Sequence, residues 1–199
     1  MPRISLTDFV DIVSKSGTPK ATKVIQVKNR PKYEPAVDFY KPVRDFIVDA
    51  HRTGEPKSIL AAALDSITDP KKLGNYPDVV TGYRKWWGSK ALVWFDSPAG
   101  IFGARGIEVV VNPELGLIVN GQRHLIKLYF KANALAKNRV DIVTHLMEFT
   151  LRSSCPRGEI MSVLDIRRAK LISPTVPIAR LGPALDAELA YIAALWDSE

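Results

Sequence analysis

The chain has 199 residues, of which 46% are hydrophobic and 25% charged, and its formal net charge is +7 at pH 7. That is an ordinary globular composition, long enough for one substantial core. No apolar run reaches the roughly 18 residues of a membrane-spanning helix, and the start (MPRISLTDFVDIV) lacks the apolar stretch of a secretory signal. The one cysteine, Cys155, excludes an intramolecular disulfide framework. We therefore expect a soluble, cytoplasmic protein without a membrane partner.

Helical spacing dominates residues 1–88 and predicts a mainly helical lobe. Helices are expected over 6–13, from about Tyr40 to Gly54, over 57–66 and over 76–88. The second begins close to Tyr40 because Pro42 fits only in the first turn of a helix. Residues 21–33 alternate in part, which predicts either a short strand or a basic loop.

After residue 88 the apolar residues recur at every second position, as in strands. Strands are predicted over 92–96, 106–111, 115–119 and 122–131, with a loop over 97–106. The strand at 106–111 is apolar on both faces, as in the middle of a sheet. A helix over 139–151, a long bent strand over 158–172 and a helix over 183–196 follow. We predict one α/β (α+β) domain, 1–199, in which residues 89–199 hold a three-strand meander, a helix, a strand and a closing helix around a sheet.

The segment NPELGLIVNGQRHLIKLYFK is the most informative. Asn120-Gly121 between two strand patterns predicts a hairpin with a type I′ turn. In that register Leu115 faces Ile126, so Glu114 faces Lys127 at the open end, and directly opposed residues share one side of the sheet. One face is then a core face, formed by Leu115, Leu117, Val119, His124, Ile126, Leu128 and Phe130. The other face, with Leu125 and Lys127, is expected to be partly covered.

A carboxylate beside a lysine is what a metal-dependent phosphodiesterase uses to hold Mg²⁺ and orient water. Pro113-Glu114 and Leu125-Ile126-Lys127, with the order helix, meander, helix, strand, make residues 76–172 similar to the PD-(D/E)XK nuclease-like superfamily. The resemblance implies Glu114 and Lys127 as catalytic residues. Because Leu125 replaces the second acid of the family, it also implies either a migrated acid or a fold without its chemistry. The candidates for a migrated metal ligand beside Glu114 are Glu108, Glu34 and Asp38.

Nucleic-acid contact is the second candidate property. Six Lys or Arg and no acid lie between residues 12 and 33, and five and no acid between 115 and 140. Such stretches attract polyanions, although many proteins simply have solvated basic faces. In GYRKWWGSK, the aromatic residues Tyr83, Trp86 and Trp87 share one helix face, which favours anchoring in the core over base stacking. The candidate nucleic-acid-binding residues are Arg84, Lys85, Lys90, Arg123 and Lys131.

These patterns leave three functions open. The first is a nuclease-like fold, catalytically degenerate, that contacts DNA, RNA or an acidic protein partner. The second is a structural or interaction protein of a small genetic module with no nucleic-acid role, in which Glu114–Lys127 is only a cross-strand ion pair. The third is an active nuclease. No cofactor is expected except Mg²⁺ or Mn²⁺ in this last case, and the three histidines show no metal-ligand spacing.

Overall fold

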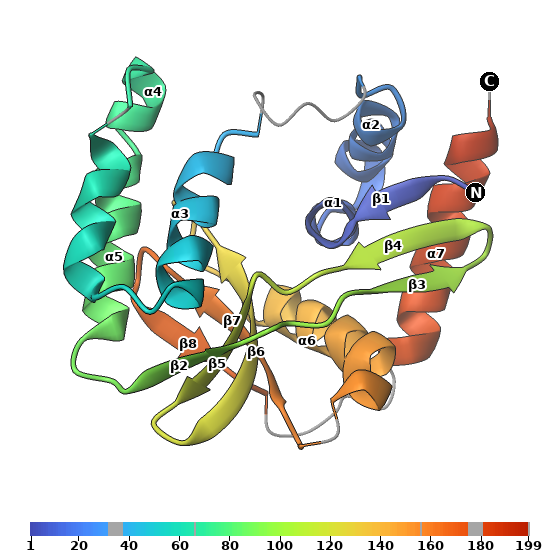
Figure 1. Ribbon diagram of the computed structural model, residues 1–199. Coiled ribbons are helices and arrows are strands. Elements are labelled where there is room, and N and C mark those ends of the chain that lie inside the picture. The colour runs from blue at the N-terminus through green and yellow to red at the C-terminus, as the bar shows by residue number, and fades with distance from the viewer. Residues whose placement is uncertain (32–37, 66, 156, 175–180, 199) are drawn as a thin grey trace.

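The computed structural model describes residues 1–31, 38–65, 67–155, 157–174 and 181–198. Within these ranges the protein has an α+β fold with two mixed β-sheets (Figure 1). The three-stranded sheet has the order β1 (Arg3–Ser5), β4 (Ile107–Val111), β3 (Gly100–Ala104), with β1 parallel to β4. The five-stranded sheet has the order β2 (Leu92–Phe95), β5 (Leu115–Val119), β6 (Gln122–Tyr129), β7 (Ile160–Asp165), β8 (Lys170–Ile172).

Helices cover both sheets, and they gather in three places (Figure 1). One group packs on the first face of the five-stranded sheet, α6 packs on its other face, and the remaining helices surround the small sheet. The first group is α3 (Lys41–Arg52), the 3₁₀ helix η2 (Lys57–Leu64) and α5 (Tyr76–Trp87). The short helix α4 (Pro70–Leu73) precedes α5 and buries none of its side chains. The others are α6 (Lys137–Leu151), the short 3₁₀ turn η3 (Arg152–Ser154), α1 (Leu6–Val13), α2 (Gly17–Lys28) and α7 (Leu181–Asp197). None of the helices in the described ranges is long and apolar enough to cross a membrane.

Several predicted elements are confirmed, and their ends have local causes. The hydroxyl of Ser5 accepts a hydrogen bond from the Asp8 backbone N–H and caps α1. Helix α3 starts directly after Tyr40 with Pro42 in its first turn, as the missing N–H of proline requires. The strand at 107–111 lies in the middle of its sheet. Where a helix is predicted over 57–66, residues 57–64 form a 3₁₀ helix.

Three predictions are wrong. In the segment 21–33, predicted as a strand or basic loop, residues 21–28 belong to α2, which buries Val24 and Val27 one turn apart, and residues 32 and 33 lie outside the described ranges. The predicted loop at 97–106 contains β3, which pairs with β4 through a two-residue turn. That turn is Arg105-Gly106, and both residues have positive φ (53° and 77°), as a type I′ hairpin needs. The predicted single strand over 158–172 is the antiparallel pair β7–β8.

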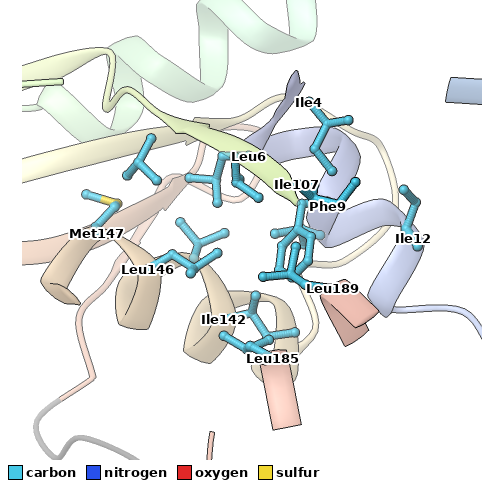
Figure 2. Close-up of a cluster of buried hydrophobic side chains, with 14 of the residues drawn as sticks. Ile4, Leu6, Phe9, Ile12, Ile107, Ile142, Leu146, Met147, Leu185 and Leu189 are labelled. Carbon is cyan, nitrogen blue, oxygen red and sulfur yellow. The ribbon is translucent and has the colours of Figure 1, made fainter. Parts of the chain in front are cut away.

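Two apolar cores lie on opposite faces of the five-stranded sheet. The first joins α1, α2, α6 and α7 to the small sheet, and Figure 2 shows part of it. The second joins α3, η2 and α5 to the inner faces of β5, β6 and β7. Residues 1–88 therefore divide between two cores that also contain the strands. In the second core α5 lies so close to the sheet that a Cβ on Gly82 would stand 2.2 Å from the Ile166 carbonyl oxygen.

Candidate functional site

The predicted hairpin is confirmed, and it brings Glu114 and Lys127 together. Asn120 and Gly121 have φ of 49° and 90°, and Leu115 pairs with Ile126 as expected. The Lys127 ammonium lies 2.5 Å from Glu114 Oε1, and the Leu128 backbone N–H donates to Glu114 Oε2 at 2.8 Å. This ion pair is not a surface contact, because the two side chains are only 10% and 13% exposed.

This pair is buried because it lies where the chain passes from one sheet to the other. Strand β4 ends at Val111 and β5 begins at Leu115, so the connection between the sheets is only three residues long. Lys127 Nζ also donates to the Asn112 carbonyl oxygen at 3.0 Å, which fixes this connection to β6. The face that carries Leu125 and Lys127, expected to be partly covered, is closed along β6 by the first core, where Leu125 is fully buried.

Beside the pair lies a small cavity of about 140 Å³ between α1, β6 and α6. Its lining includes a second carboxylate, Asp11 of α1. Asp11 accepts hydrogen bonds from Lys131 Nζ at 2.6 Å and from Arg139 Nη1 at 2.7 Å. Burial by itself would raise the pKa of Asp11, but the hydrogen bonds and charges of Arg139 and Lys131 outweigh it and lower the pKa. The ionised form of Asp11 is therefore the stable one at neutral pH.

A larger groove of about 860 Å³ adjoins this cavity and shares Thr7, Arg44, Glu114 and Lys127 with it. Arg44 donates to Asp38 at 3.0 Å. Burial opposes the charge of Arg44, but the hydrogen bond from Arg44 to Asp38 and the charges of Asp38 and Glu114 raise the pKa of its guanidinium. The cationic lining of the groove, five Lys or Arg against three acids, is formed by Arg3, Lys28, Arg30, Arg44 and Lys127.

The predicted nucleic-acid-binding residues separate into three places. Lys131 lines the cavity. Arg123 stands at the other end of β6, where it pairs with Glu159 at 2.9 Å and lies over the Phe95 ring. Arg84 and Lys85 are exposed on α5, and Lys90 donates to the Trp86 carbonyl oxygen.

Tyr83, Trp86 and His51 have structural roles. Tyr83 and Trp86 are buried in the second core, so the prediction that they anchor the helix is confirmed. His51 donates to or accepts from Tyr83 Oη at 2.8 Å and stacks on Trp87. Burial lowers the pKa of His51 to about 4, so its imidazole is neutral at physiological pH.

Within the described ranges the carboxylates do not assemble a site for Mg²⁺ or Mn²⁺. Glu108 lies in neither the cavity nor the groove, and it pairs with Arg3 at 2.8 Å. Asp38 binds Arg44, and Glu34 lies outside the described residues. Among the residues that are described, no three His, Cys, Asp or Glu come together as metal ligands. Since Glu114 and Asp11 both face protein cations, this donor set does not fit an ion that requires several free oxygens.

Sequence reasoning missed three side chains of the cavity: Asp11, Arg44 and Arg139. One signal was present for Asp11, because it interrupts the apolar pattern of the helix at 6–13 next to residues that become core. Arg44 and Arg139 do not interrupt an apolar pattern in this way, because each lies on a helix next to other polar residues.

Comparison of the chain with the models of known protein families, with curated proteins and with solved structures finds no match. The site must therefore be interpreted from its own geometry.

Proposed function

We propose that this protein binds nucleic acid through the phosphates, in a nuclease-like fold that has lost its metal-dependent chemistry. The observation that carries the proposal is the groove and cavity at the crossing of the two sheets. Five cations and three acids line the groove, a formal excess of two positive charges (5 − 3). A concave surface with excess positive charge concentrates polyanions and contacts their phosphates.

The order of the strands supports the nuclease-like part of the proposal. Strands β2, β5 and β6 form an antiparallel meander, and β7 returns through α6 to lie parallel to β6. The resemblance implied this sequence of meander, helix and strand. The β3–β4 hairpin enters between the first and second strands of the meander, and Pro113-Glu114 follows it directly.

Loss of hydrolysis is supported by the surroundings of Leu125. The family places its second acid at this position, but here an apolar side chain is fully buried in the first core. A carboxylate there would be charged in an apolar core, which is strongly unfavourable without a partner. The protein therefore keeps a phosphate-binding surface next to a site that lacks the ligands for cleavage.

The test measures the binding of an internally labelled DNA duplex by fluorescence anisotropy at several salt concentrations. If three phosphates are contacted, affinity should fall about 40-fold between about 50 mM and about 200 mM salt. Lys28→Met in the groove should remove about one phosphate contact and so lower the slope of log affinity against log salt by about 1. The matched control is Lys170→Met, which removes an exposed lysine of β8 outside the groove and leaves the salt dependence unchanged.

Two results would contradict the proposal. Binding that is absent, or that is insensitive to salt, refutes the nucleic-acid part. Cleavage of DNA or RNA in Mn²⁺ by the wild-type protein, abolished by both Lys127→Ala and Glu114→Ala, refutes the loss of chemistry and establishes an active nuclease instead.

A further inference from the structure

The cavity next to Glu114 and Lys127 adjoins the groove and shares four lining residues with it. Part of its lining is made of core side chains, Leu6, Val143 and Val163, which are 0%, 7% and 2% exposed. Its volume of about 140 Å³ exceeds what a single water molecule needs and has room for one tetrahedral anion with its ester carbon.

The charge of the cavity is suited to a divalent anion. Four cations line it (Arg44, Lys127, Lys131 and Arg139) against two carboxylates (Asp11 and Glu114), a formal charge of +2 (4 − 2). A phosphate monoester carries about −1.5 to −2 at pH 7, whereas each phosphodiester within a strand carries −1. Part of the wall is apolar, and charge-assisted hydrogen bonds are stronger in such surroundings.

Donors remain available beside Asp11. This one carboxylate receives two cations, so the group of Asp11, Lys131 and Arg139 is itself positive by one charge. Arg139 uses one terminal nitrogen for Asp11, and its side chain has no other hydrogen bond among the residues that the structure describes. A guanidinium has five N–H donors in a planar fork that matches phosphate oxygens.

From these observations we infer that the cavity binds a terminal phosphate monoester, so that the protein recognises the phosphorylated end of a nucleic-acid strand. This inference rests on the proposed function. The strand lies in the groove and its terminal phosphate enters the cavity beside Arg139 and Lys131. No metal ion takes part in this recognition, because the cations of the chain itself neutralise the phosphate.

The experiment compares single strands of one sequence, labelled at an internal base, that carry a 5′-phosphate, a 3′-phosphate or hydroxyls at both ends. A circular strand of the same composition serves as a ligand without ends. One phosphorylated strand should bind about tenfold more tightly than the hydroxyl strand, as one or two charge-assisted bonds predict. Which of the two strands gains identifies the end that is recognised.

Two variants test the cavity itself. Lys131→Met and Arg139→Gln each leave Asp11 with one cation, so the two variants check each other for effects on folding. Both should reduce the preference for the phosphorylated end to about twofold or less, while Lys170→Met keeps the full tenfold preference.

The outcomes separate the two proposals. Equal, salt-sensitive binding of phosphorylated, hydroxyl and circular strands overturns the inference and leaves the proposed function standing. A preference that persists in both cavity variants also overturns it, because the terminal phosphate is then bound elsewhere. If no strand binds at all, the proposed function fails and the inference fails with it.

Discussion

Replacing Lys127 by methionine tests whether the Glu114–Lys127 pair holds the two sheets together. The lysine is 8% exposed, and its ammonium donates to the Glu114 carboxylate and to the Asn112 carbonyl oxygen. Methionine keeps the apolar stem and removes the charge. Glu114 then remains buried with one hydrogen bond from the part of the chain that the structure describes, donated by the Leu128 N–H at 2.8 Å.

The expected size of the effect follows from that burial. Removing one partner of a fully buried ion pair typically lowers the free energy of unfolding by about 3 to 5 kcal/mol. Because the Glu114 side chain is 13% exposed and keeps one hydrogen bond, the lower end applies, about 3 kcal/mol. Glu114→Gln leaves one oxygen, which can accept from Lys127 or from Leu128, and its NH₂ group replaces the other acceptor. It should lower the stability by about 1 to 2 kcal/mol.

Urea unfolding of the wild-type protein, the two single variants and the double variant completes the measurement. The double variant carries no unpaired charge, so it should be more stable than the sum of the single effects predicts, by at least about 1 kcal/mol. A loss below about 1 kcal/mol in Lys127→Met, together with additive effects in the double variant, would show that the pair does not fix the connection between the sheets.

Two further substitutions test the packing of α5 and its histidine partner. Alanine in place of glycine normally stabilises a helix by about 1 kcal/mol, but Gly82→Ala should destabilise the protein by about 2 kcal/mol or more, since its Cβ would meet the Ile166 carbonyl oxygen. Urea unfolding measures this; Gly103→Ala, whose Cβ has open space, is the control, and equal effects would contradict the close approach. His51 has an ordinary pKa of 6.5 and a pKa of about 4 in the folded protein. The unfolded chain therefore takes up the proton first, and stability should fall by about 3 kcal/mol as the pH drops from about 6.5 to about 4. His51→Gln should remove this part of the pH dependence, and the same pH slope in wild type and variant would refute the assignment.

The hairpin could be predicted in full from local sequence. Asn120-Gly121 permits a turn that few other dipeptides form, and the turn fixes the register of every pair on the two strands. Glu114 and Lys127 are only 13 residues apart, so their meeting followed from the same register. Arg105-Gly106 makes an equivalent turn, but the glycine-rich strand before it has no alternating pattern, and β3 was therefore predicted as a loop.

The rest of the cavity depends on contacts between distant parts of the chain. Asp11 meets Lys131 and Arg139 across 120 and 128 residues, and no local pattern specifies such a pairing. Strand β1 is three residues long and pairs with β4 across more than 100 residues, so it carries no signal of its own. In α2 the apolar residues from Val24 to Val27 fit the two-residue period of a strand as well as the 3.6-residue period of a helix. Packing against the first core selects the helix.

The composition of the first core has a consequence for how the chain is made. This core contains side chains from Ile4 at one end of the sequence to Ile192 at the other, and α2 packs against α7. The buried side chains of the second core come from residues 43 to 166. During synthesis the second core can therefore form before α7 has left the ribosome, while the apolar faces of α1 and α2 are still without α7. Nascent chains stalled before α7 should accordingly be cleaved by protease in α1 and α2, and protection of these helices at that stage would contradict this order of assembly.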